Sequence, residues 1–420
     1  MVNVLQNCLR RLHPVYKMKL EQIANDPLGT FIHLERYCHF YNYPDLIRLG
    51  DFKPEYSSFA SDKPVNLAML RLPKCNVEVS LTDLSSNVLK RFIQEDEVYF
   101  PVHPQVLEEK NCLVVNDACQ KAIDIGQLES QPTASVRTLF VNDENPFFIK
   151  VHFPRRISSL TREITAEDIA IGRWFTDEFK RASDSGELPT DMGFYPELLG
   201  VCYRSGENSA GAIIRDFNTY PKMPNSYSVP LSALFSRDVK SPDERPLLFS
   251  LAEVNHNNPE DYLIDEIITP HMRQWAWLAF DFGVIFNSHG QNVVLQFDSN
   301  WKVRRFDYRD FQGRLVVPEI RAKNRLSLPC SLLRREQNMD FATEISVSYD
   351  FMLGDRLYDR LLEPLKEAGY MTKPLVQKIR DLFTHIVGDN AHFFRKSRIY
   401  YQGITTDRRQ VDIGKPPKYR

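Results

Sequence analysis

The spacing of apolar residues along the chain predicts both helices and strands. Apolar positions three or four residues apart, as on one face of a helix, mark residues 5–12, 17–24, 357–369 and 373–388. Runs rich in Val, Leu and Ile, bounded by Pro and Asp, predict strands at 66–73 and 77–81. Because strand pairs and helices do not alternate regularly, the pattern favours an α+β fold over a doubly wound parallel sheet.

Three further pairs of strands are predicted from neighbouring runs of this kind. SVRTLFVND and NPFFIKVHF flank a turn at 143–145, and residues 194–204 are expected to pair with 210–217. The third pair is a hairpin formed by VVLQF (293–297) and KVRRFDYRDF (302–311).

Capping signals and apolar runs predict the intervening helices. A Thr-x-x-Asp signature begins a helix over Thr165–Asp184, and Ser85 or Ser86 is expected to cap a helix that ends near Glu95. Residues 264–288 are nearly apolar all round in their second half, which predicts one long buried helix ending at the SHGQN segment. Residues 220–245, rich in Pro and Ser, are predicted to be a loop.

Composition and charge narrow the class of protein. A chain of 420 residues suggests two or three domains or subdomains. Its 53 basic and 55 acidic side chains give a net charge of −2, so the overall charge favours neither nucleic acid nor a membrane surface as a partner. The seven cysteines include no CxxC pair, which predicts neither a disulfide framework nor a zinc site and fits a cytoplasmic protein. The sequence contains no run of about 18 apolar residues, so no membrane-spanning helix is predicted.

Two polar clusters, His-Gly-Gln-Asn and Arg-Asp, flank the predicted hairpin at 293–311. Asn292 and Asp310 supply hard oxygen ligands of the kind that Mg²⁺ accepts when phosphate oxygens complete its shell. His289 and Gln291 suit hydrogen bonding to a phosphate or to a developing oxyanion. Turn chemistry is the plainer interpretation, but both clusters flank one hairpin that follows a buried segment, so we favour a site for a phosphate and its metal.

Cationic side chains on the earlier strands suit the same kind of ligand. Ser135 and Arg137 would share one face of a strand, with Thr138 facing away, and a guanidinium is a fixed fork of donors for phosphate or carboxylate. Lys150 lies in the apolar run FFIKVHF, so it either reaches a wet face or meets an anion. An ordinary strand and a solvated basic loop at 155–162 are the alternatives. His103, between two prolines, is interpreted as structural.

Several common nucleotide-binding signatures are absent from the sequence. Residues 281–283 spell the DFG of kinases, but they fall in the apolar run, and no HRDxxxxN precedes them at a suitable distance. Neither GxxxxGK[ST] nor GxGxxG occurs, which argues against a P-loop and a Rossmann dinucleotide site.

In order along the chain, these clusters resemble the motifs of the NRPS-independent siderophore synthetases, the aerobactin-synthetase-like enzymes. The resemblance is carried by PVHPQ (101–105), SVRT (135–138), Lys150, Ser158 to Arg162, NSHGQN (287–292) and RDFQG (309–313). The chain departs from the family at Asn287, where the family has Glu, and in the missing Trp of PVHPWQ. The family's usual N-terminal region is expected to be absent.

The resemblance implies a thumb, fingers and palm architecture with antiparallel sheets and a helical C-terminal part. The regions would be a partial thumb at 1–100, a fingers-like region at 101–245 and a palm-like region at 246–420. It also implies a ligase that adenylates a carboxylate such as citrate with ATP, releases pyrophosphate and AMP, and joins the acyl group to an amine or hydroxyl in siderophore biosynthesis. Its partners would be small-molecule carboxylates and amines, with a homodimer or a separate chain supplying the missing N-terminal region.

Carried over by motif, the resemblance assigns residues to each ligand. ATP and Mg²⁺ would be held by Ser135, Arg137, Thr138, Lys150, Gln291, Asn292 and Asp310, with Asn292 and Asp310 on the metal. The carboxylate substrate would face Ser158, Arg162 and His289. The catalytic residues would be His289, Arg137 and Lys150. Two other classes stay open: a kinase-like phosphotransferase, and a non-catalytic relative that binds a partner.

Overall fold

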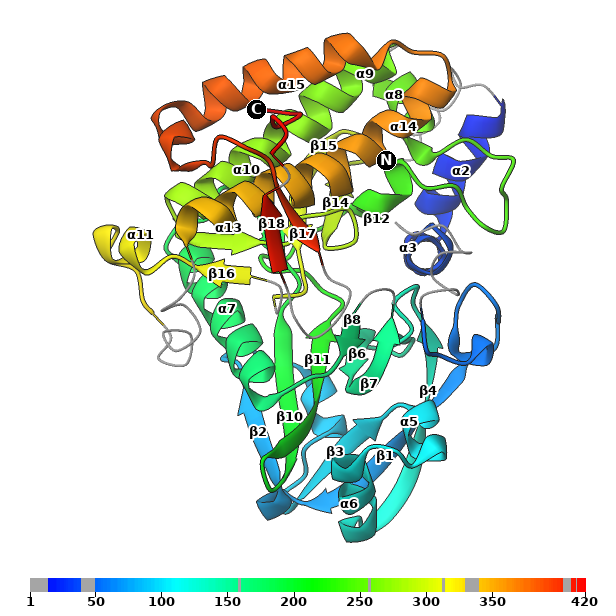
Figure 1. Cartoon of the computed structure of the whole chain (residues 1–420). Helices are drawn as coiled ribbons and strands as arrows, with labels where there is room; N and C mark the ends of the chain where they lie inside the picture. Colours follow the sequence, from blue (N-terminus) through cyan, green and yellow to red (C-terminus); the bar gives the residue numbers. More distant parts are fainter. Residues whose placement is uncertain are drawn as a thin grey trace.

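The computed structural model describes residues 14–38, 50–157, 160–255, 258–311, 314–328, 340–402, 409–412 and 414–420. Figure 1 shows one large sheet in the lower half, and a layer of helices above a smaller sheet in the upper half. This arrangement confirms the expected α+β fold with a helical C-terminal part, and the sheets are antiparallel except where 192–194 pair in parallel with 306–308. Within the described residues, no helix combines the length and apolar character needed to cross a membrane.

The large sheet has eight strands in the order β2-β10-β11-β6-β5-β4-β1-β3. They are β1 (Val65–Pro73), β2 (Val77–Leu81), β3 (Glu97–Val102), β4 (Asp124–Pro132), β5 (Thr138–Val141), β6 (Phe147–Val151), β10 (Glu197–Ser205) and β11 (Asn208–Asp216). Antiparallel pairing of β5 with β6 and of β10 with β11 confirms two of the predicted strand pairs.

The two faces of this sheet are packed differently. One face is covered by α6 (Leu113–Lys121), with α5 (Pro104–Glu109) beside it, and the other by α7 (Ala166–Asp184), which lies over β2, β10 and β11. The capping box predicted at the start of α7 is present. A Cβ atom on Gly200 would lie 2.0 Å from Ile169 Cγ2, so glycine at this position lets α7 pack directly on β10.

The smaller sheet has the order β12-β14-β15-β9, formed by β12 (Tyr227–Pro230), β14 (Val293–Phe297), β15 (Val303–Tyr308) and β9 (Met192–Phe194). The predicted hairpin is confirmed, since β14 and β15 pair antiparallel with Val293 opposite Tyr308. This register places the residues before β14 and those after β15 together at the open end of the hairpin.

Helices cover the smaller sheet and form most of the C-terminal region (Figure 1). They are α2 (Pro14–Asn25), α3 (Pro27–Tyr37), α8 (Leu247–Asn255), α9 (Pro259–Tyr262), η5 (Leu263–Ile268), α10 (Thr269–Phe280), α13 (Phe341–Val347), η6 (Ser348–Tyr358), α14 (Asp359–Glu367) and α15 (Thr372–Val387). Short elements complete the chain: η1 (Pro54–Tyr56), η2 (Lys74–Asn76), β7 (Phe153–Ile157), β8 (Leu160–Arg162), β13 (Val284–Phe286), β16 (Arg314–Val316), α11 (Pro318–Lys323), η7 (Gly388–Phe393), β17 (Ile399–Gln402) and β18 (Arg409–Asp412). The helices predicted at 17–24, 357–369 and 373–388 are confirmed, whereas 5–12 lies outside the described residues.

Three sequence predictions are wrong in extent. The helix predicted over 264–288 ends at Phe280, because Gly283 adopts φ +67° and turns the chain into β13, which pairs with β16. Ser86 is an N-cap as expected, but only the short 3₁₀-helix η3 (Asn87–Arg91) follows it. The loop predicted at 220–245 contains β12 and the 3₁₀-helix η4 (Leu231–Leu234), since β14 offers β12 a pairing edge that a local pattern cannot reveal.

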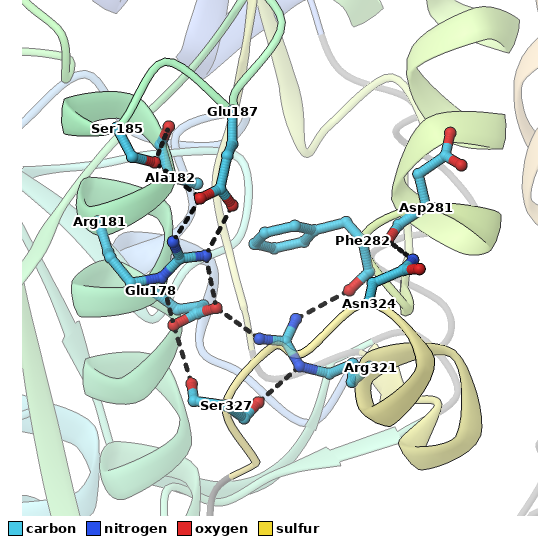
Figure 2. Close-up of polar contacts among 10 residues, drawn as sticks. All are labelled: Glu178, Arg181, Ala182, Ser185, Glu187, Asp281, Phe282, Arg321, Asn324 and Ser327. Carbon is cyan, nitrogen blue, oxygen red and sulfur yellow. Dashed lines mark hydrogen bonds and ion pairs between the residues drawn. The ribbon is translucent and has the colours of Figure 1, made fainter.

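A buried arginine anchors the segment that follows the hairpin. Arg321 of α11 is 0% exposed and forms an ion pair with Glu178 of α7 (Figure 2). Its other guanidinium nitrogens donate to the carbonyl oxygens of Phe282 at 2.8 Å and of Ser327 at 2.6 Å. Arg181 contacts the same Glu178 carboxylate at 3.1 Å but keeps 41% of its side chain exposed. These contacts fix α11, and with it β16, against α7.

Candidate functional site

Lys150 of β6 forms a direct ion pair with Asp310, two residues beyond β15. Alternation along β6 explains the direction of the lysine: Phe147, Ile149 and Val151 pack into the core beneath the sheet, while Lys150 lies on the opposite face. Of the two alternatives for this lysine, a wet face or an anion, the structure shows contact with an anion. Burial lowers the pKa of Lys150 to about 8, and the attraction of Asp310 opposes that shift.

Asp310 adopts a conformation that is unusual for a residue other than glycine. Its φ is +68°, and 34% of its side chain remains exposed. Burial by itself raises the pKa of Asp310, but Lys150 and Arg215 outweigh it and hold that pKa far below its ordinary value. The carboxylate is thus ionised, held by cations on one side and open to solvent on the other.

The SVRT segment forms a tight turn between β4 and β5, so the prediction that Ser135 and Arg137 share a strand face is wrong. Val136 adopts φ +64° and is fully buried in the core of the large sheet. Anchoring this side chain bends the chain, and Arg137 N donates to the carbonyl oxygen of Ser135 at 2.7 Å. A β-branched residue in this region is strained, a feature that concentrates at functional sites. The strand begins at Thr138, directly opposite Lys150.

Arg137 connects this turn to β8. Its Nη1 donates to the carbonyl oxygens of Arg162 at 2.6 Å and Glu163 at 3.2 Å. Burial lowers the pKa of Arg137 to about 9, and Asp310 is close enough to oppose this shift. Arg137, Lys150 and Asp310 therefore belong to one electrostatic cluster.

The open end of the hairpin holds the remaining predicted residues. Asn292 N donates to the carbonyl oxygen of His289 at 2.9 Å, and Arg309 N donates to that of Asn292 at 3.1 Å. Asn292 Nδ2 donates to the carbonyl oxygen of Asn287 at 2.9 Å. Because Gln291 N donates to Nδ1 of His289 at 3.3 Å, the proton of the neutral imidazole is on Nε2. Burial lowers the pKa of His289 to about 4, so the ring is neutral near pH 7.

Glu35 of α3, which no sequence pattern singled out, holds these segments together. Arg309 Nη2 donates to Glu35 Oε1 at 2.6 Å, and its Nε donates to the carbonyl oxygen of Gln291 at 3.0 Å. The carbonyl oxygen of Glu35 accepts from Ala134 N at 3.2 Å. A small cavity of about 10 Å³ lies here, of a size for one water molecule; it is lined by Glu35, Thr133, Ala134, Ser135, Ser232, Gln291 and Arg309.

A second buried ion pair, also missed from the sequence, lies beside Lys150. Arg215 Nη2 donates to Glu197 Oε1 at 2.9 Å, and it lies 4.0 Å from Asp310 Oδ1. Both side chains are at ends of apolar strands, where ELLGVCYRS begins and NSAGAIIRD ends. A charged residue at the end of an apolar strand was the sequence feature that could have indicated this ion pair.

Other motif residues lie outside the described part of the chain or have a structural role. Ser158, Gln312 and Gly313 lie outside the described residues. His103 is fully buried and caps α5, with Nδ1 accepting from Gln105 N at 3.2 Å, in line with its structural interpretation.

In the part of the chain that the structure describes, no group of three or more His, Cys, Asp or Glu side chains is placed to hold a metal. A separate groove of about 870 Å³ lies at α14 and α15, away from these motifs.

Comparison with known proteins relates part of the sequence to a family and the fold to solved structures. The model of the IucA / IucC family matches residues 54–236. Just under half of the chain is therefore similar to the IucA / IucC family. The match includes the SVRT turn, Lys150 and Arg162, while the hairpin end lies beyond it. A curated relative, N(2)-citryl-N(6)-acetyl-N(6)-hydroxylysine synthase of Vibrio mimicus, is 22% identical over 254 residues, which cover 52% of this chain and 39% of that protein.

Solved structures of siderophore-related proteins share the fold. ATP-bound aerobactin synthetase IucA of a hypervirulent pathotype of Klebsiella pneumoniae superposes with a TM-score of 0.67 at 14% identity, covering 91% of this chain and 75% of that one. Petrobactin biosynthesis protein AsbB of Bacillus anthracis gives a TM-score of 0.59 at 16% identity, covering 94% and 78%. The expected likeness to aerobactin synthetases is thereby confirmed for the fold.

Proposed function

We propose that this chain is an ATP-dependent ligase that adenylates a polycarboxylate such as citrate and transfers the acyl group to an amine or hydroxyl in siderophore assembly. The observation that carries the proposal is the contact of Lys150 with Asp310, which joins the strand motifs to the hairpin motifs. A citryl-hydroxylysine synthase among the relatives and an ATP-bound aerobactin synthetase among the structures that share the fold support the same reaction class.

The first step requires the protein to stabilise negative charge that develops on the phosphoryl oxygens. A carboxylate oxygen attacks the α-phosphorus of ATP, an acyl–phosphate bond forms, and pyrophosphate leaves, so negative charge builds on the phosphoryl oxygens. Arg137 and Lys150 supply positive charge next to Thr138 and Ser135, whose hydroxyls can donate to phosphate. Neutral His289, protonated on Nε2, can donate a hydrogen bond to developing charge without adding a cation.

The carboxylate substrate is assigned to the side of the site near β8. Arg137 donates to the carbonyl oxygen of Arg162, so a ligand that reaches the Arg162 side chain would lie next to the nucleotide residues. Ser158 and His289 complete the proposed substrate set. The second step needs no nucleophile from the protein, because the bound amine or hydroxyl attacks the acyl carbon and AMP departs.

A magnesium ion fits the oxygen donors at the hairpin end. Asp310 is ionised and partly exposed, and Asn292 adds a neutral amide oxygen. Mg²⁺ typically binds one or two such protein ligands together with the phosphates of its substrate, whose charge it neutralises. Asp310 contacts Lys150 in this structure, so coordination of Mg²⁺ by the Asp310 carboxylate would compete with this ion pair.

The nature of the products tests the proposal. Purified protein is incubated with MgATP over crossed panels of polycarboxylates and amines, and pyrophosphate and ADP are measured together. The ligase releases pyrophosphate with at least one pair. ADP without pyrophosphate would instead identify a kinase-like phosphotransferase. No turnover of ATP across the panels, with Lys150→Ala and Asp310→Ala leaving biological activity intact, would identify a non-catalytic relative.

A further inference from the structure

Arg215 is a buried cation on the same face of the large sheet as Lys150. In the register of β11 and β6, Ile213 lies opposite Lys150, and Arg215 lies two residues further along. Residues two apart on a strand share a face, so the two cationic side chains project to the same side. The side chain of Arg215 is only 6% exposed.

Its guanidinium is incompletely satisfied. Nη2 donates to Glu197, and the same nitrogen is at the 4.0 Å limit of an ion pair with Asp310. Buried Nε has no hydrogen-bond partner among the described residues. Leaving a buried donor unpaired costs free energy, and native proteins rarely do so without a ligand or water in reach.

The charges around Asp310 leave an excess of positive charge. Lys150, Arg215 and Arg137 all act on its carboxylate. Asp310 and Glu197 are paired within this set, and Arg162 and Asp168 add one charge of each sign beside Arg137, so among these groups four cations face three carboxylates. Glu197 lies opposite Arg215 in the register of β10 and β11 and accepts a hydrogen bond from Nη2, which orients the guanidinium.

We propose that Arg215 is an anion-binding residue of the active site, positioned by Glu197, and that it takes an oxyanion of the phosphate or carboxylate class. The proposal deepens the proposed function and rests on it for the identity of the ligand. Such an oxygen could come from the triphosphate of ATP or from a carboxyl group of the substrate. A planar guanidinium with an unused donor matches both.

Calorimetric titration of the full chain distinguishes these sources. The probes are MgATP, AMP, tripolyphosphate and citrate, and the variants are Arg215→Gln and Arg215→Lys. Loss of affinity by about tenfold or more for MgATP and tripolyphosphate, with AMP unaffected, assigns Arg215 to the phosphates. A comparable loss for citrate alone assigns it to the carboxylate substrate. In either case Arg215→Lys should lose less affinity than Arg215→Gln, because lysine keeps the positive charge but lacks the planar set of N–H donors of a guanidinium.

Removing one partner of a buried pair can unfold the chain, so a second variant is required. Arg215→Gln with Glu197→Gln leaves no unpaired buried charge, and its circular dichroism and melting temperature report folding. Arg204→Gln, an exposed arginine on β10 paired with Glu78, is the matched control and should bind all probes normally.

The proposal is overturned if the folded double variant binds every probe within about twofold of the unsubstituted chain. If binding of tripolyphosphate or citrate depends on Arg215 but no pyrophosphate is released, Arg215 is an anion-binding residue and the ligase activity is disproved. If the double variant releases pyrophosphate normally, the ligase activity is supported and the proposed role of Arg215 is disproved.

Discussion

Lys150 and Asp310 are in direct contact although 160 positions separate them in the sequence. The lysine belongs to a strand of the large sheet, and the aspartate follows the hairpin of the smaller sheet. Their ion pair therefore joins the two sheets, which also meet in an apolar cluster that contains Phe148 and Val294. It also brings the SVRT turn and the SHGQN segment to the two sides of one charged cluster.

Binding of MgATP should depend on Arg137 and Lys150. Both supply positive charge at the proposed phosphates, and a charge-assisted hydrogen bond contributes roughly 1.5–3 kcal/mol, so Arg137→Ala and Lys150→Met should each weaken MgATP about 10- to 100-fold. Calorimetry measures the dissociation constants. Arg173→Ala, on the exposed face of α7, is the control. Unchanged MgATP affinity in Arg137→Ala would count against the nucleotide assignment.

His289→Ala should lower turnover much more than it lowers nucleotide affinity. Its neutral imidazole is proposed to act on charge that develops in the transition state, so kcat should fall by about 100-fold while the dissociation constant of MgATP changes by about threefold or less. Steady-state pyrophosphate release and calorimetry supply the two numbers. Equal losses in both would make His289 a ground-state binding residue.

A polycarboxylate should stabilise the native chain in the presence of MgATP. A ligand at about 100 times its dissociation constant adds about 2.7 kcal/mol to the free energy of unfolding. Differential scanning fluorimetry with citrate should therefore show a higher melting temperature, with acetate as the monocarboxylate control. Arg162→Ala should abolish the shift while leaving the effect of MgATP in place. No shift over a panel of polycarboxylates would point to another substrate or an inactive site.

The free energy of unfolding should depend on Arg321 far more than on Arg181, although both contact Glu178 (Figure 2). Arg321→Met leaves a buried carboxylate short of a partner, which costs about 3 kcal/mol or more. Arg181 is largely solvated, so Arg181→Met should cost about 1 kcal/mol or less. Urea unfolding followed by circular dichroism gives both values. Similar small losses in the two variants would mean that the buried pair contributes little net stability.

Local features of the sequence predicted local structure well. The Thr165–Asp168 capping box, the strand pair across 143–145 and the hairpin at 293–311 all depend on neighbouring residues, whose propensities act at short range. For Lys150 the sequence left two alternatives, a wet face or an anion, and only the contact with Asp310 decides between them.

Long-range contacts account for what the sequence did not reveal. Glu35 was missed because its partner Arg309 is 274 positions away, and Arg215 because only the sheet register places it beside Lys150. The SVRT turn was taken for a strand because its bend depends on burial of Val136 in a core built from distant strands. Hydrophobic periodicity carries no information on any of these pairings.

The transfer of an oxygen atom tests the adenylation claim most directly. The chain is incubated with MgATP, an amine and citrate labelled with ¹⁸O in its carboxyl groups, and the nucleotide products are analysed by mass spectrometry. Adenylation links a carboxyl oxygen to the α-phosphorus, and attack at the acyl carbon leaves that oxygen on AMP, so AMP should carry one heavy oxygen. Unlabelled AMP, or ADP with the label in inorganic phosphate, would contradict an acyl-adenylate ligase.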